Sequence, residues 1–123
     1  FGNGNLSVAG TISDSMGPLR RLGQTITTPN YTLIASDAGK HVRVDSGATI
    51  TIPDNVFTSG DMITIVANSS NDVPIVQGSG LNLYNASDGT TGNKTLKART
   101  VCTILIAEGG SGAKAYIAGG GLS

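Results

Sequence analysis

Short apolar segments that alternate with polar residues recur along the whole chain, and residues that favour turns separate them. A period of two places one side of a segment against a core and the other toward solvent when the segment is a β-strand. No stretch carries the apolar repeat of an amphipathic helix for more than a turn or two. The pattern therefore predicts an all-β protein, with strands at residues 6–12, 24–28, 31–35, 41–45, 48–52, 62–68, 73–77, 81–84, 95–98, 101–107 and 113–118.

The spacing of these segments is typical of a β-sandwich or barrel, and we expect an antiparallel β-sandwich of jelly-roll type with an N-terminal β arm. A chain of 123 residues is long enough for one domain with a modest core. Because only 4% of the residues are aromatic and none is Trp, that core must consist of Ile, Val, Leu and Ala. We assign residues 1–22 to the arm and its linker, and residues 23–123 to the sandwich.

The stretch YTLIASDAGKHVRVD begins and ends like a strand but is interrupted in the middle. Ser36 suits a helix N-cap, Asp37 suits a first helical turn, and Gly39 can adopt the left-handed conformation that ends the turn. We expect a single helical turn that links two strands as a corner. After the corner, Val42 and Val44 share one face of the second strand.

The stretch ATITIPDNVFTSGD predicts a strand that stops at a proline. Ile50 and Ile52 are expected to face the core, and Pro53 ends the ladder because it lacks a backbone donor. Val56 and Phe57 are expected to tuck back against the core as a plug.

The stretch TVCTILIA is apolar on both of its faces. Val101 and Leu105 lie on one face, whereas Cys102, Ile104 and Ile106 lie on the other. This favours a strand that is covered on both sides, where one cover can be another subunit. The only cysteine of the chain excludes an internal disulfide, and its apolar setting predicts a buried, inert thiol.

The N-terminal stretch NLSVAGTI alternates cleanly, but no neighbouring segment offers it a hairpin partner. An isolated strand is not stable in water. We therefore expect this arm to pair with other copies of the chain around a shared axis, where a glycine permits close approach. The predicted interface residues are Leu6, Val8, Gly10 and Ile12.

The charges argue against several classes of partner and activity. Eight acidic and eight basic residues give a net charge of zero, so we expect no binding of nucleic acid and no insertion into a membrane. The single histidine, His41, lies on the polar face of a strand, where a solvated or interface side chain is expected rather than a catalytic one. The stretch GGSGAK lacks the Ser or Thr of a phosphate-binding loop and is interpreted as a hairpin loop. We expect no enzyme, no cofactor and no metal site.

The best candidate for recognition is the stretch LYNASDGTTGNK, because a rigid β-scaffold commonly carries binding residues on such loops. Its candidate contact residues are Tyr84, Asn85, Asp88 and Asn93. The alternative interpretation is a connection that is merely exposed to solvent.

Several stretches in order carry a resemblance to a known family: GTISDSMGPLRRL, YTLIASDAGKHVRV, TITIPDNVFTSGDMITIVANSS, PIVQGSGLNLY, GTTGNKTLKARTVCTILIA and IAGGGLS. The chain resembles the C-terminal module of tail fibres and related virion structural proteins of tailed phages, notably marine and cyanobacterial phages. The stretch AEGGSGAKAY departs from the family pattern, so the last hairpin is expected to differ.

The resemblance implies a β-rich, non-enzymatic and usually trimeric module on the surface of a virus particle. Its implied partners are two further copies of the chain, other virion proteins, and a glycan or protein of the host surface. The alternative within the same family is a capsid decoration or vertex protein that binds the shell through its N-terminal arm. Because the sequence starts at Phe1 without an initiator Met, we expect it to be a processed product or a fragment of a longer protein.

Overall fold

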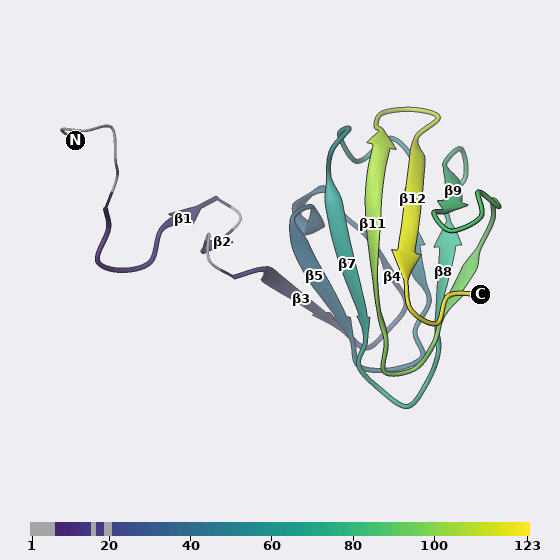
Figure 1. Cartoon of the computed structure of the whole chain (residues 1–123), viewed down its shortest axis with the longest axis horizontal. Coiled ribbons are helices and arrows are strands. Elements are labelled where there is room, and N and C mark those ends of the chain that lie inside the picture. The colour runs from purple at the N-terminus through teal and green to yellow at the C-terminus, as the bar shows by residue number, and fades with distance from the viewer. Residues whose placement is uncertain (1–6, 16, 19–20) are drawn as a thin grey trace.

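The computed structural model describes residues 7–15, 17–18 and 21–123, and within them the chain is all-β (Figure 1). The strands form a six-stranded sheet, a four-stranded sheet and a separate two-stranded pair. The only helical element of the described residues is a 3-10 turn, η1. The elements are β1 Ser13–Asp14, β2 Gly17–Pro18, β3 Gly23–Thr27, β4 Tyr31–Thr32, η1 Ala35–Asp37, β5 Lys40–Val44, β6 Ile50–Ile52, β7 Met62–Ala67, β8 Val73–Gln77, β9 Asn82–Asn85, β10 Lys94–Leu96, β11 Val101–Glu108 and β12 Lys114–Gly119.

From β3 to β8 the chain alternates between the two sheets. Strands β3, β5 and β7 lie side by side in the six-stranded sheet, whereas β4, β6 and β8 lie side by side in the four-stranded sheet. Each strand pairs in parallel with the next strand of its own sheet. The chain therefore winds around the core, and each turn of this winding contains one strand from each sheet: β3 and β4, then β5 and β6, then β7 and β8.

The last strands close the two sheets in a different way. Strand β9 returns to the far edge of the six-stranded sheet and pairs in parallel with β12. Strand β10 pairs antiparallel with β8, and β11 pairs antiparallel with both β7 and β12. The sheet orders are β3-β5-β7-β11-β12-β9 and β10-β8-β6-β4.

The prediction of antiparallel pairing throughout is wrong, because both sheets are mixed. The reason is that the turn residues after β3 to β7 do not make hairpins, but carry the chain across to the other sheet. Strands that return to a sheet after such an excursion run in the same direction and pair in parallel. The jelly-roll connectivity, which consists of antiparallel neighbours, is not confirmed by this order.

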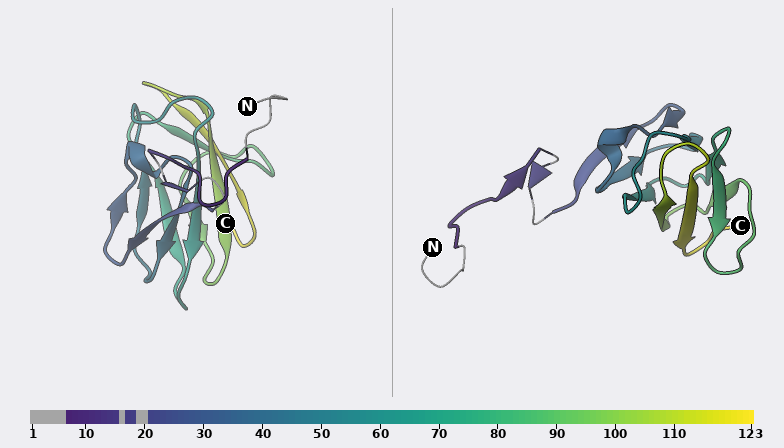
Figure 2. Two further views of the ribbon diagram at one scale, coloured as in Figure 1. Left: turned by 90° about the vertical axis from the view of Figure 1, so that its left-hand side faces the viewer. Right: turned by 90° about the horizontal axis from the view of Figure 1, so that it is seen from above.

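Most predicted strands are present with end shifts of a few residues. The exception is the stretch NLSVAGTI: its residues 7–12 form no strand, and Leu6 lies outside the described residues. Val8, Gly10 and Ile12 are exposed. Figure 2 shows this N-terminal arm leading away from the two sheets, with β1 and β2 as a small pair along its course. Val8, Gly10 and Ile12 are therefore not part of the core within the described chain.

One core lies between the two sheets, and the period-two pattern explains its composition. Val42 and Val44 of β5 are fully buried, as are Ile50 and Ile52 of β6, which confirms these predictions. Phe57 is the one buried aromatic side chain among the described residues, and mainly branched aliphatic side chains fill the rest of the core, as the composition requires. The largest fully buried side chains are Leu33, Val42, Ile50, Ile52, Ile63, Ile65, Ile75, Leu83, Leu96, Ile104, Ile106 and Ile117.

The predicted plug and the predicted doubly covered strand are both only partly confirmed. Phe57 is buried, but Val56 is 39% exposed, so only one of the two side chains packs on the core. In β11, the face with Cys102 is buried, whereas Val101 and Leu105 on the other face are exposed. No segment of the described chain covers this outer face of the six-stranded sheet.

The interruption between β4 and β5 is a corner built around a buried carboxylate. The turn η1 is present as predicted, but Ile34 rather than Ser36 occupies the N-cap position. Asp37 is 1% exposed, and its carboxylate accepts hydrogen bonds from Thr25 Oγ1 at 2.7 Å, Tyr31 OH at 2.7 Å and the backbone N–H of Ile34 at 2.9 Å. Asp37 therefore ties β3, β4 and η1 together.

This corner makes stability sensitive to alkaline pH. Burial, together with the hydrogen bond to Asp37 and its charge, raises the pKa of Tyr31 from 10.0 to about 12. An ordinary phenol of the unfolded chain ionises more readily, so the contribution of Tyr31 to stability is complete below pH 10 and is lost as the pH rises toward 12. We expect Tyr31→Phe to flatten this region of the stability profile, measured by urea unfolding at several pH values. If the free energy of unfolding fell equally steeply with pH above pH 10 in the wild type and in Tyr31→Phe, Tyr31 would not be the group responsible.

The buried thiol of β11 gives a second test of the core. Burial raises the pKa of Cys102 from 9.0 to about 12, and its side chain is 1% exposed. Because the thiolate is the reactive form, we expect no labelling of Cys102 by an aromatic disulfide reagent in the native protein and complete labelling in denaturant. Rapid labelling under native conditions would show that β11 does not belong to a closed core.

Candidate functional site: the loop after β9 and the tyrosine pair

The predicted recognition stretch, residues 83–94, contains the loop of residues 86–93 that connects β9 to β10, and polar groups of the stretch itself hold this loop. Asn85 Oδ1 accepts hydrogen bonds from the backbone N–H of Ser87 at 3.0 Å and from its hydroxyl at 2.8 Å. The backbone of Asn85 also accepts from Gly89 N–H at 2.8 Å and donates to Thr90 O at 2.8 Å. The loop is therefore a compact, hydrogen-bonded turn.

Asp88 has a similar structural role further along the loop. Its Oδ1 accepts from the backbone N–H of Thr90 at 3.0 Å and from Thr90 Oγ1 at 2.7 Å. These two hydrogen bonds lower the pKa of Asp88, with a further contribution from the charge of Lys94. The carboxylate is thus ionised at neutral pH, but its contacts lie within the loop.

Asn93 joins the end of the loop to the neighbouring strand. Its Oδ1 accepts from the backbone N–H of Gln77 in β8 at 3.0 Å, and Gln77 Oε1 accepts from the backbone N–H of Leu83 in β9 at 3.0 Å. These amide contacts link strands of the two sheets. Three of the four predicted contact residues therefore use their side chains to hold the loop, which favours the alternative interpretation for Asn85, Asp88 and Asn93.

Tyr84, the fourth predicted residue, belongs to a different surface. Its ring stacks on that of Tyr116, with centroids 5.2 Å apart and an angle of 21° between the planes. The register places Tyr84 beside Tyr116, Tyr116 beside Leu105, and Leu105 beside Met62. An apolar row thus crosses β9, β12, β11 and β7 on the outer face of the six-stranded sheet. We call these four residues the tyrosine row.

A charged pair lies at the end of the sheet next to the tyrosine row. Lys114 Nζ is 3.1 Å from Glu108 Oε2, and this hydrogen bond and charge raise the pKa of Lys114, with smaller effects from Tyr84 and Tyr116. The tyrosine row therefore offers flat aromatic rings, and the adjacent pair offers one positively and one negatively charged group that can form hydrogen bonds. Such a surface can bind a partner by stacking and by polar contacts at its margin.

Tyr116, Leu105 and Met62 were not predicted as site residues. They stand far from the loop in the sequence, and only the register of β12 with β9 and β11 brings them to Tyr84. The one signal in the sequence was the second apolar face of TVCTILIA, which was interpreted as a subunit contact.

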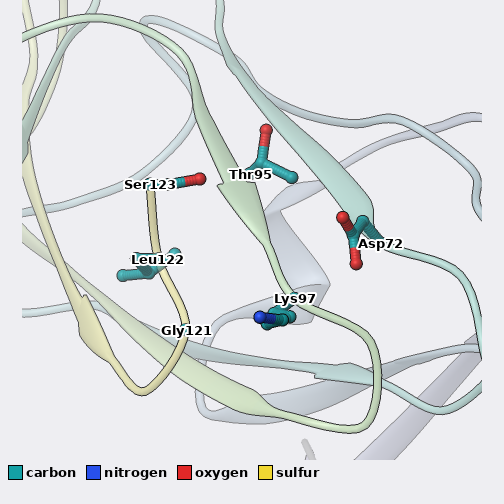
Figure 3. A pocket seen from close by; sticks show the side chains of 6 residues that line it. All are labelled: Asp72, Thr95, Lys97, Gly121, Leu122 and Ser123. Carbon is teal, nitrogen blue, oxygen red and sulfur yellow. The ribbon is translucent and has the colours of Figure 1, made fainter.

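An open depression lies where residues 121–123 run along β10 (Figure 3). Thr95 and Lys97 line it from β10 and the residue beyond that strand, and Asp72 lines it from the turn before β8. Asp72 Oδ1 accepts from the backbone N–H of Ala98 at 2.9 Å, so this carboxylate holds a turn. The lining contains no second carboxylate, histidine or cysteine that could complete a catalytic or metal-binding set.

His41 Nε2 lies 2.9 Å from Gln24 Nε2 on the outer face of the sheet. Within residues 7–15, 17–18 and 21–123, no cluster of His, Cys, Asp or Glu could hold a metal ion. In the same ranges, no helix has the length and apolar character to cross a membrane.

In comparisons with known proteins, no family model and no curated protein matches this chain.

Proposed function

We propose that this chain is a non-enzymatic structural module of a bacteriophage particle, the C-terminal domain of a trimeric tail fibre or similar appendage. In this proposal the two sheets form a β-sandwich at the particle surface, other virion proteins adjoin it, and the tyrosine row contributes to contact with the host surface. The resemblance described above supplies the class of protein. The structure supports an assembly role through one observation: the apolar residues of the arm have no partner within the described residues of their own chain.

Two surfaces of the single chain remain to be covered. Val8 and Ile12 of the arm are 47% and 40% exposed, although aliphatic side chains of this kind are normally buried. The outer face of the six-stranded sheet adds Ile26 and Val101, which lie outside the tyrosine row, as exposed apolar side chains. Contiguous exposed apolar surface commonly marks an interface, and closed symmetry lets every copy cover the same surface. A homo-oligomer is therefore the arrangement that best suits this chain.

The capsid-decoration alternative uses the same arm to grip a shell. Immunogold labelling of purified particles with an antibody against residues 23–123 separates the two cases. We expect label at the tail appendages. Label spread over the capsid would contradict the tail-fibre proposal and favour the capsid-decoration alternative. Particles without label would contradict both proposals.

The arm itself gives the most direct test of assembly. We expect Val8→Asp to weaken the oligomer by at least about tenfold in dissociation constant, because a charge cannot be buried in an apolar interface without a partner. The measurement is sedimentation equilibrium over a range of protein concentrations. Val56→Asp is the control, since Val56 is an exposed apolar residue of the loop after β6. A monomeric wild-type chain, or equal effects of the two changes, would contradict the role of the arm.

A further inference from the structure

The six-stranded and the four-stranded sheet have four edges between them, and three of these edges are short or already covered. The edge strand β4 has only two residues. The edge of β9 is covered by residues 90–92, through a bridge between Tyr84 and Thr91 and through the hydrogen bond from Gly92 N–H to Leu83 O. The edge of β10 is covered by residues 121–123, whose backbone bonds to Thr95 in both directions. Such devices prevent unwanted pairing at exposed strands.

The edge strand β3 has none of these protections. It has five residues, GQTIT, without charge or proline, and within the described residues it pairs only with β5. Thr27 O accepts from the backbone N–H of Asp45, so the backbone groups of Thr27 face β5. Because successive residues of a strand direct these groups to opposite sides, the N–H and C=O of Gln24 and Ile26 face the open edge. These are free places for an additional strand.

The side chains along this edge also lack a cover. Ile26 is 54% exposed, and Leu22, four positions earlier in the same alternation, is 51% exposed. The arm presents the same spacing, because Val8 and Ile12 are also four positions apart. Neither the stretch SVAGTI of the arm nor LGQTIT at the edge contains a charged residue. A strand pair between them would place apolar side chains beside apolar side chains on one face.

We propose that residues 7–12 of one copy add as an extra strand to the β3 edge of a neighbouring copy. The proposal deepens the function given above and rests on its oligomer. Figures 1 and 2 show the arm leading away from β3 and from both sheets, which places residues 7–12 where a second molecule can accept them. If each copy in a closed ring gives its arm to the next copy, every arm pairs with one β3 edge and every β3 edge receives one arm. Main-chain hydrogen bonds supply affinity, and the apolar side chains supply the register.

Cysteine cross-linking tests this pairing. Two double variants combine Ile26→Cys with either Val8→Cys or Ile12→Cys, so that both strand directions are sampled. After mild oxidation, denaturation with an alkylating reagent and electrophoresis without reductant, we expect one variant to give covalent oligomers up to the trimer. The single variants should remain monomeric, because Cys102 is buried. Cross-linked monomers alone would show that the arm folds back on its own edge, and the absence of cross-links in both would also overturn the proposal.

A charge at the edge gives an independent readout. We expect Ile26→Lys to raise the dissociation constant of the oligomer about tenfold or more, since it removes an apolar contact and places a charge at the edge. Val56→Lys is the control on an exposed loop, and circular dichroism checks that both variants retain the fold. An unchanged oligomer after Ile26→Lys would overturn the strand exchange but leave the proposed function intact. A wild-type monomer would overturn the proposed assembly itself.

Discussion

Replacing Asp37 with Ala is expected to reduce the free energy of unfolding by about 3–5 kcal/mol, because three partly buried donors lose a buried carboxylate, and a hydrogen bond to a charged group contributes about 1.5–3 kcal/mol. The carboxylate is 1% exposed and accepts from Thr25, Tyr31 and the backbone of Ile34. Because the carboxylate is buried, water replaces it less readily than it would replace an exposed carboxylate. The effect should appear as a lower urea midpoint at unchanged slope.

Asp88→Ala is the matched control for this prediction. Asp88 also accepts from a hydroxyl and a backbone N–H, but it is exposed, so water can replace its carboxylate. We expect a loss of less than about 1 kcal/mol for Asp88→Ala. Asp37→Asn should fall between the two, because the amide keeps an acceptor but turns a donor toward a donor. Equal effects of the two alanine changes would mean that the corner does not depend on Asp37.

Replacing Gly119 with Ala is expected to cost about 2–3 kcal/mol, because the neighbouring β11 must shift to accept an extra methyl group. Gly119 lies in β12 opposite Cys102 of β11. A Cβ atom there would lie 2.5 Å from Val101 O, 2.7 Å from Cys102 Cα and 2.8 Å from Cys102 Cβ. Most of these atoms belong to the backbone of the central ladder, so no side-chain rotation relieves the contact.

The next residue supplies the control for this second change. A Cβ atom at Gly120 would meet nothing within 4 Å, and its backbone is not in the left-handed region. We expect Gly120→Ala to change stability by no more than about 0.5 kcal/mol. Thermal unfolding of both variants, followed by circular dichroism, measures the difference. A Gly119→Ala protein as stable as Gly120→Ala would contradict the register between β11 and β12.

The candidate site was predictable only where it depends on local chemistry. Asn85 and Asp88 lie in a glycine-rich turn as the sequence predicts, but their side chains have the internal role that such residues often take. Tyr84 was identified, whereas its stacking partner Tyr116 was not. Partners of this kind cannot be found from one segment, because they depend on which strands are neighbours in the sheet.

The alternating pattern by itself determined the all-β class, most strand positions and which side chains of each strand face the core, as Val42, Ile50 and Ile104 show. These features are local, because the period of a strand and the burial of its apolar side follow from a few consecutive residues. The tertiary structure decided that β3, β5 and β7 run in parallel, that Asp37 is buried under three donors, and that the β3 edge stays open within the described chain. The same turn residues can start a hairpin or lead into the opposite sheet. Only the packing of the two sheets around one core selects between these paths.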